Sequence, residues 1–171
     1  MRPAVLLVAH GSPPKDVPRE MLDRLRRLRV LGGEEEELRR LEEAIRKWPR
    51  SRENDPHWWS TERIARMLSE RLGLDVHTAY LEFCSPTVEE KLGELLRKHG
   101  LVVVVPTMVV EGGRHVEVDI RREIESALAR VGRGRVVYAF PFRMEDFVEL
   151  LARQVLRFLG GLGEGPEGAK G

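Results

Sequence analysis

The sequence predicts a three-layer, flavodoxin-like α/β fold, in which a parallel β-sheet carries helices on both faces. Four short apolar segments recur along the 171-residue chain, at 4–9, 75–83, 101–110 and 135–142. The first and third are apolar throughout, which is typical of strands that are covered on both faces. Segments with helical spacing separate the strands, and this alternation indicates a parallel sheet with right-handed crossovers.

A long connection follows the first strand, 4–9. Residues 31–59 hold a charged helix and a loop rich in Pro, Asn and Asp, which we interpret as an insertion in the first crossover. The next helix is predicted over 60–73, because this segment begins with Ser and Thr and ends at Gly73. Its apolar residues share one helical face, and they are Ile64, Met67, Leu68 and Leu72.

The second half of the chain repeats the alternation of strand and helix. After the strand at 75–83, a helix is predicted over 85–100. Ser85 is expected to be its N-cap, Pro86 its first helical residue and Gly100 its terminator. The remaining elements are predicted as a strand at 101–110, a helix at 115–132, a strand at 135–142 and a helix at 144–160.

The chain length fits a single domain, which we predict over residues 1–159. The insertion at 31–59 belongs to this domain. Residues 160–171, with the sequence GGLGEGPEGAKG, are rich in glycine. We therefore expect 160–171 to form a disordered tail.

Composition and charge limit the classes of function. Apolar residues make up 42% of the chain and charged residues 33%, as in soluble globular proteins. The formal net charge is +1, so no overall field attracts nucleic acid or a membrane surface, and we expect neither as a partner. No segment has the length of a signal peptide or membrane span, and a single cysteine, Cys84, excludes an internal disulfide. We expect a cytoplasmic protein.

Several chemically active side chains follow the predicted strands. His10 comes after the first strand, Glu82 and Cys84 after the second, and His115 after the third. Ligands of open α/β sheets bind beyond the carboxyl ends of the strands, so these residues are expected to lie close together. Two imidazoles and a carboxylate suit a divalent transition metal, and three protein ligands leave coordination positions free for a reaction.

Each of these residues also has an ordinary structural explanation. His10 could cap the strand end by a hydrogen bond to a carbonyl, and Glu82 could be a solvated carboxylate. Cys84 fits a small buried apolar residue better than it fits a ligand. The convergence of His10, Glu82 and His115 is what favours a metal site.

Three stretches of the chain carry a family resemblance. They are LLVAHGSP at the start, AYLEFCSPTVEEKL in the middle, and VVVVPTMVVEGGRHVEVDI after it. Together they resemble the class II chelatases, the small sirohydrochlorin cobaltochelatases and ferrochelatases of cobalamin and sirohaem biosynthesis. The resemblance covers residues 4–12 and about 75–142. It implies that His10 and His115 are metal-binding and catalytic, and that Glu82 assists them and shares the metal.

The resemblance implies an activity as well as a fold. The expected reaction is insertion of Co²⁺ or Fe²⁺ into sirohydrochlorin, without an organic cofactor or ATP; the ligand set also accepts Ni²⁺. Asp119, one turn after His115, either orients that imidazole or places negative charge at a helix N-terminus, and both interpretations stay open. The substrate carries several carboxylates. Groups expected to bind them are Ser12, Ser85, Thr87 and Arg114.

The size of the chain predicts its assembly. One α/β unit supplies one wall of a cleft, and the resemblance implies that a second copy supplies the other, so we expect a homodimer. Residues 31–59 add apolar side chains that fit the core, the dimer contact or a cover over the macrocycle. These side chains are Leu38, Leu41, Ile45, Trp48, Trp58 and Trp59.

Other functions are less consistent with the residues. A histidine phosphatase carries an arginine directly before its histidine, where this chain has Ala9. A serine hydrolase that uses Ser12 would need the G-x-S-x-G turn, which is missing. A carrier that binds a metal or tetrapyrrole without catalysis stays open as the alternative, although a carrier has no need of Glu82.

Overall fold

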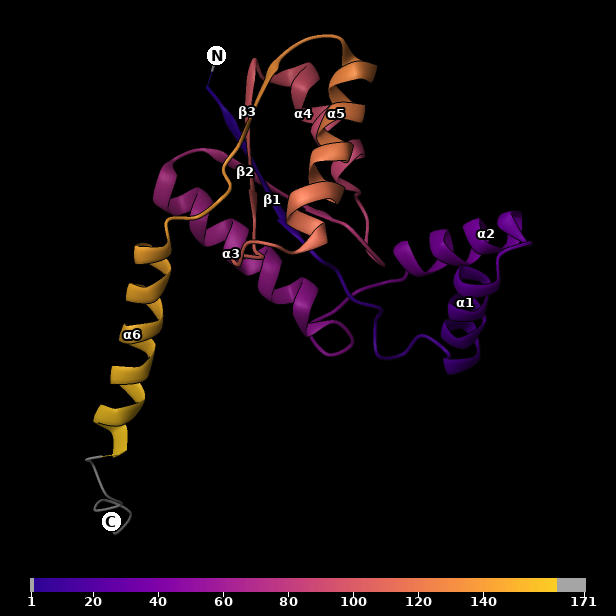
Figure 1. Ribbon diagram of the computed structural model, residues 1–171, viewed down its shortest axis with the longest axis horizontal. Coiled ribbons are helices and arrows are strands. Elements are labelled where there is room, and N and C mark those ends of the chain that lie inside the picture. The colour runs from indigo at the N-terminus through magenta and orange to yellow at the C-terminus, as the bar shows by residue number, and fades with distance from the viewer. Residues whose placement is uncertain (1, 163–171) are drawn as a thin grey trace. The chain divides into compact units, whose positions relative to one another are not determined.

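The computed structural model describes residues 2–162, and within them four parallel strands form one sheet in the order β2–β1–β3–β4 (Figure 1). The strands are β1 (Ala4–Ala9), β2 (Asp75–Tyr80), β3 (Leu101–Pro106) and β4 (Arg135–Tyr138). The order and the parallel pairing confirm the predicted α/β fold. Strands β2, β3 and β4 end earlier than expected, because the residues after them turn away from the sheet to form loops.

The chain divides into two compact units, Met1–Phe140 and Pro141–Gly171. The first holds the sheet and helices α1 to α5, and the second holds α6 (Met144–Leu162). The predicted domain, 1–159, spans the first unit and extends into the second, and its boundaries stay a prediction. Of the predicted tail, residues 160–162 belong to α6, and 163–171 lie outside the described residues.

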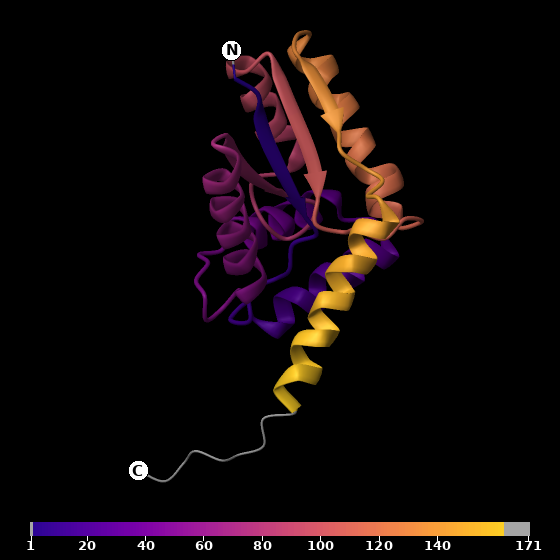
Figure 2. The same cartoon turned by 90° about the vertical axis from the view of Figure 1, so that its left-hand side faces the viewer.

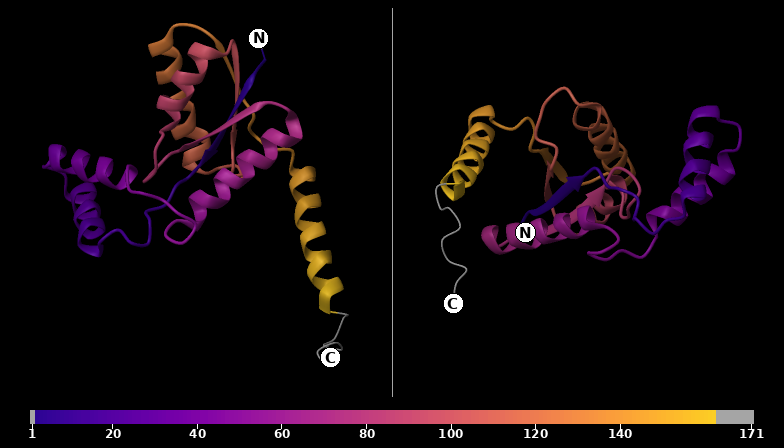
Figure 3. Two further views of the ribbon diagram at one scale, coloured as in Figure 1. Left: turned by 180° about the vertical axis from the view of Figure 1, so that it is seen from behind. Right: turned by 90° about the horizontal axis from the view of Figure 1, so that it is seen from below.

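Helices cover both faces of the sheet in the first unit. Helix α3 (Pro56–Leu72) lies on one face, and α4 (Val88–Lys98) and α5 (Ile120–Val131) lie on the other (Figure 3). All six residues of the central strand β1 are buried between these layers. The core is therefore centred on β1, whose carboxyl end leads directly into the loop that carries His10.

The first crossover contains three helices: α1 (Arg19–Leu31), α2 (Glu35–Arg46) and α3. Helices α1 and α2 pack together beyond the carboxyl ends of the strands (Figure 1, Figure 2). The sequence analysis missed α1, although Leu22, Leu25 and Leu28 have helical spacing. Buried Ile45 lies at the centre of their contact, and the apolar residues that pack around it include Leu38, Leu41 and Trp48. These insertion residues therefore form core.

The two remaining tryptophans of the insertion differ in their surroundings. Trp58 packs against the buried cluster of Ala9, Tyr80 and Cys84. Trp59 is 44% exposed and lines a surface cavity on α3. Only Trp58 therefore belongs to the core.

Helix α4 begins later than predicted. Thr87, not Ser85, is its N-cap: the Thr87 hydroxyl accepts a hydrogen bond from the Glu90 amide, and the Glu90 side chain accepts one from the Thr87 amide. Pro86 precedes the helix because its carbonyl accepts a hydrogen bond from the Tyr80 amide at the end of β2. The helix also ends at Lys98, before Gly100.

Helix α3 turns a different face to the sheet than its apolar spacing predicts. Its buried residues are the small Thr61 and Ala65, which let it approach β2 closely. Ile64, Met67 and Leu72 are about half exposed. The neighbouring Glu62 explains the rotation, because its carboxylate accepts hydrogen bonds from the Thr78 and Tyr80 hydroxyls of β2.

Candidate metal centre

Three of the four strands end side by side at one edge of the sheet. Ala9 of β1 pairs with Tyr80 of β2, and Val8 pairs with Pro106 of β3. The loops that follow these strands consequently start from neighbouring points. This edge is where parallel α/β sheets bind ligands, and the predicted site residues lie there.

His10 is held by the backbone around it. Its Nδ1–H donates a hydrogen bond to the Gly11 carbonyl at 2.7 Å, which directs Nε2 away from the strand. The Glu82 amide donates to the His10 carbonyl at 2.8 Å, so the loops after β1 and β2 are joined. Gly11 has φ +89°, and a Cβ there would lie 2.0 Å from the Glu82 carbonyl oxygen. Only glycine permits this approach.

His115 is held by a side chain of its own helix. Residues His115–Asp119 form a π-helical turn, η1, in which the Ile120 amide donates to the His115 carbonyl. The turn brings Asp119 beside the ring, and His115 Nδ1–H donates to Asp119 Oδ2 at 2.9 Å. Asp119 thus orients the imidazole, as one of the two sequence-based interpretations proposed. It also lies at the N-terminus of α5, so both interpretations remain.

The two imidazoles face each other. His10 Nε2 and His115 Nε2 lie 3.1 Å apart, and the rings meet edge to face with centroids 4.6 Å apart. Because each Nδ1 already donates to an acceptor, both Nε2 atoms are the positions at which an ion can bind. With metal–nitrogen bonds of about 2.0–2.1 Å, this separation corresponds to an angle of roughly 100° at the ion. That angle suits tetrahedral or octahedral coordination.

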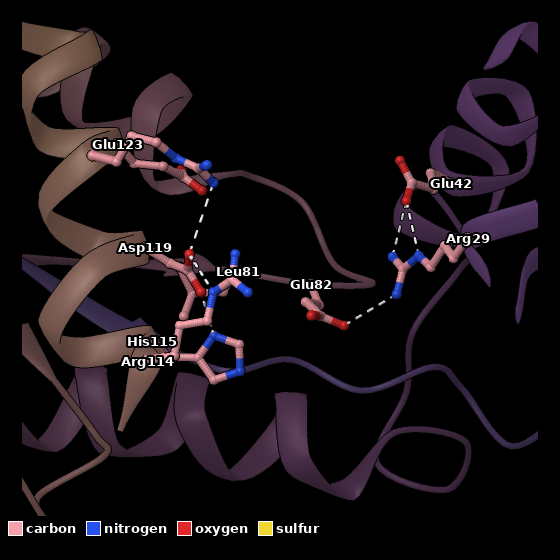
Figure 4. Close-up of a pocket in the computed structure, with 9 residues that line it drawn as sticks. Arg29, Glu42, Leu81, Glu82, Arg114, His115, Asp119 and Glu123 are labelled. Atoms are coloured by element: carbon pink, nitrogen blue, oxygen red, sulfur yellow. Dashed lines mark hydrogen bonds and ion pairs between the residues drawn. The ribbon is translucent and has the colours of Figure 1, made fainter. Parts of the chain in front are cut away.

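Glu82 completes the cluster. One ligand atom from each of His10, Glu82 and His115 lies within 4.8 Å of the others, and all three side chains are partly exposed. Figure 4 shows Glu82 between His115 and Arg29. Arg29 of α1 pairs with Glu82 at 3.4 Å and with Glu42 of α2 at 2.9 Å. The structure therefore brings together the three predicted ligands, with an arginine as counter-ion to the carboxylate.

An open cavity of about 680 Å³ adjoins the cluster. It is lined by Arg29, Glu42, Leu81, Glu82, Arg114, His115, Asp119, Arg122 and Glu123. Three of these residues are arginines and four are acidic, and each arginine pairs with an acidic residue of the cavity. Burial raises the pKa of Glu123, whose carboxylate accepts a hydrogen bond from the Glu89 amide.

Of the predicted anion-binding groups, only Arg114 lines this cavity. The hydroxyls of Ser12 and Thr87 already have protein partners: Ser12 donates to Asp55, and Thr87 caps α4. The Ser85 carbonyl is the hydrogen-bond partner of the Cys84 thiol. A role for these groups in substrate binding stays a prediction.

Cys84 lies apart from the ligand cluster. Its side chain is 1% exposed, and burial raises the pKa of the thiol to about 12. A metal-binding thiol needs the opposite shift, towards the thiolate.

The sequence analysis missed two of the three arginines of the cavity. Arg122 lies one turn after Asp119, so its helical spacing could have placed it there. Arg29 reaches the site from the first crossover, across 53 positions of sequence from Glu82, and no local pattern indicates this contact.

Comparison with known proteins identifies the family. The sequence model of the family described as CbiX matches residues 54–157, which is more than half of the chain. The chain belongs to the CbiX family. CbiX proteins are class II chelatases, as the sequence motifs indicated. No curated protein matches the chain.

A solved structure supports the fold. A putative cobalamin (vitamin B12) biosynthesis CbiX protein from Marinobacter aquaeolei is 20% identical, with a TM-score of 0.53 over 91% of this chain and 95% of that one. The sirohydrochlorin chelatase SirB from Bacillus subtilis subspecies spizizenii, solved in complex with cobalt, is also 20% identical. Its match has a TM-score of 0.44 and covers 82% of this chain and 44% of SirB. The matched part of this chain thus covers less than half the length of SirB.

Over residues 2–162, no helix of this CbiX protein combines the length and the hydrophobicity that are needed to cross a membrane.

Proposed function

We propose that this CbiX-family protein inserts a divalent metal ion, Co²⁺ or Fe²⁺, into sirohydrochlorin. The observation that carries the proposal is the pair of imidazole Nε2 atoms 3.1 Å apart, with Glu82 beside them. Imidazole and carboxylate are ligands that these ions accept, and three protein ligands leave room for the macrocycle nitrogens. Membership of the chelatase family supports the same reaction.

The chemistry requires proton transfer as well as metal binding. When a divalent ion enters the macrocycle, two pyrrole N–H protons must leave it. Glu82 is a base at the site, and the imidazoles become bases once they have released the ion. Each of these groups can accept a proton. Arg29 pairs with the Glu82 carboxylate at 3.4 Å and supplies its counter-charge.

The arginines of the cavity beside the cluster can bind the acidic substrate by exchanging their present carboxylate partners for those of the macrocycle. Arg29, Arg114 and Arg122 line the cavity, and guanidinium groups form paired hydrogen bonds with carboxylates. We assign them to the carboxylates of the tetrapyrrole. Ser12, Ser85 and Thr87 remain further candidates from the sequence.

A second copy of the chain would complete the site. The cavity is open to solvent, and a flat macrocycle needs contacts on both of its faces. We propose a homodimer that encloses the substrate and functions in the cytoplasm, within cobalamin or sirohaem biosynthesis.

Anaerobic metal insertion tests the proposed reaction. Co²⁺, Fe²⁺ and Ni²⁺ are added separately to sirohydrochlorin with the protein, and the absorbance change of the macrocycle is followed. We expect catalysed insertion of at least one of Co²⁺ and Fe²⁺, and loss of it in His10→Ala and His115→Ala. His57→Ala, an exposed histidine of α3, is the matched control and should retain activity. Binding of metal and macrocycle without insertion would indicate the carrier instead.

A further inference from the structure

A buried ion pair lies against the loops that carry His10 and Glu82. Arg50 and Asp55 flank the turn between α2 and α3, and their side chains are 6% and 1% exposed. Arg50 Nη1 bonds to Asp55 Oδ2. Arg50 Nε is also buried, and no acceptor within residues 2–162 reaches it. Such a pair stabilises a fold little compared with apolar packing, because both charges lose their hydration. The contacts of this ion pair therefore indicate a role other than stabilising the fold.

The Arg50 guanidinium joins three segments of the chain. Nη1 donates to the Ser12 carbonyl at 3.0 Å, in the loop that follows His10. Nη2 donates to the Phe83 carbonyl, directly after Glu82, and to the Ile45 carbonyl at the end of α2. One side chain thus connects the loop of one predicted ligand with the loop of another.

Asp55 holds the loop of Ser12 as well. Its Oδ1 accepts hydrogen bonds from the Ser12 hydroxyl at 3.2 Å and from the Trp58 amide at 2.9 Å. The second bond makes Asp55 the N-cap of α3. Asp55 therefore ties Ser12 to a helix that is packed on the sheet, and it neutralises Arg50.

The residue held by Arg50 has an unfavourable backbone conformation. Phe83 has φ +57°, the only positive φ among the non-glycine residues described in 2–162. This conformation is unfavourable for a bulky residue, and it persists only where the surroundings enforce it. The Arg50 bond to the Phe83 carbonyl and the packing of the Phe83 ring supply that constraint. The conformation turns the chain directly after Glu82.

We infer that Arg50 and Asp55 are positioning residues of the metal centre. The buried pair fixes the Glu82–Phe83 turn relative to the loop of His10, so that the carboxylate stays within reach of the imidazoles. Neither residue touches the ion. The inference rests on the proposed function, and it also gives residues 49–55 of the insertion a role in that function.

Two substitutions test the inference with Co²⁺ alone as the probe. Arg50→Lys retains the positive charge, but a single ammonium cannot hold the Ser12 and Phe83 carbonyls together. Asp55→Asn retains an N-cap for α3 and removes the negative charge, so it is the variant of choice if Arg50→Lys does not fold. Titration by calorimetry should show a loss of Co²⁺ affinity of roughly tenfold to a hundredfold, as for residues that orient metal ligands.

A control variant separates positioning from stability. Leu96→Ala opens a cavity under α4 beside Gly134, at the amino end of β4, and lowers the melting temperature without belonging to the cluster on which Phe83 packs. We expect it to bind Co²⁺ as tightly as the unmodified protein. Unchanged Co²⁺ affinity in folded Arg50→Lys and Asp55→Asn would overturn the inference, as would an equal loss in Leu96→Ala.

Hydrogen exchange distinguishes failure of this inference from failure of the proposed function. The Glu82 amide donates to His10 and the Cys84 amide donates to Glu82, so both report on the turn without any metal. Exchange over residues 81–84 should be faster in Arg50→Lys than in Leu96→Ala. If the unmodified protein binds neither Co²⁺ nor Fe²⁺, the proposed function is wrong. In that case, exchange at 81–84 decides whether Arg50 positions the turn.

Discussion

The two walls of the candidate metal centre are held in different ways. The helical wall carries His115, and its orientation depends on Asp119, four residues further along the same turn. The loop wall carries His10 and Glu82, which are 72 positions apart and joined by backbone contacts. A buried arginine from a third segment holds the loop wall together.

This difference separates two kinds of preorganisation. On the helical wall, one local hydrogen bond directs the ring, so a change there should reach only that ring. On the loop wall, close packing and a shared ion pair hold two ligands at once, so a change there should disturb both. Substitutions on the loop wall should therefore affect stability and metal binding together, whereas those on the helical wall should affect metal binding alone.

The largest effect is expected at Gly11. In Gly11→Ala the new Cβ would lie 2.0 Å from the Glu82 carbonyl oxygen, so the loops must separate. We expect the free energy of unfolding to fall by about 3 kcal/mol or more and Co²⁺ binding to be lost. Thermal unfolding and calorimetry measure the two effects.

Gly112→Ala is the matched control for Gly11. Gly112 has φ +84°, but no atom lies within 4 Å of an added Cβ. The cost should be the backbone strain alone, about 1–2 kcal/mol, with Co²⁺ binding retained. Equal losses in the two variants would show that close packing of the loop wall has no special role.

A smaller effect is expected on the helical wall. In Asp119→Asn the side-chain amide can donate to His115 Nδ1, which places the ring proton on Nε2, where the ion should bind. Co²⁺ affinity should fall roughly tenfold to a hundredfold with little change in melting temperature. Glu125→Gln, the same change on an exposed position of α5, should leave the affinity unaltered. Full affinity in Asp119→Asn would favour the helix-terminus interpretation.

The smallest effect is expected at Cys84, which is buried near the loop wall outside the ligand cluster. Cys84→Ala should leave Co²⁺ affinity within about twofold and cost about 1 kcal/mol of stability. Because the thiol has a pKa of about 12, the thiolate fraction at pH 8 is far below that of a free cysteine. Iodoacetamide should consequently modify the folded protein slowly and the guanidinium-unfolded protein rapidly. Fast alkylation of the folded protein, or lost Co²⁺ affinity in Cys84→Ala, would place the thiol in the site.

The fold was largely accessible from the sequence because local patterns determine its elements. Continuous apolar runs indicated β1 and β3, and the alternation with helices indicated a parallel sheet. The errors arose where tertiary contacts compete with local signals. Hydrogen bonds from β2 to Glu62 rotate α3 away from its apolar stripe, and the Pro86 carbonyl contact with Tyr80 delays the start of α4.

The residues of the site differ in how well the sequence predicts them, and this difference follows the two walls. His10, Glu82 and His115 follow strand ends, so topology alone predicts that they converge. Asp119 is local to His115, and its spacing was sufficient to propose the contact. Arg50 has no such signal, because its partners come from three distant segments. Long-range polar contacts of this kind require coordinates.

The central claim is that His10 and His115 bind one ion together. A double-mutant cycle on Co²⁺ affinity tests it most directly, with calorimetric titration of His10→Ala, His115→Ala and the double variant. If the two Nε2 atoms share an ion, each single substitution abolishes tight binding, and the double variant binds no more weakly than either single variant. Two modest losses that add in the double variant would contradict a shared site.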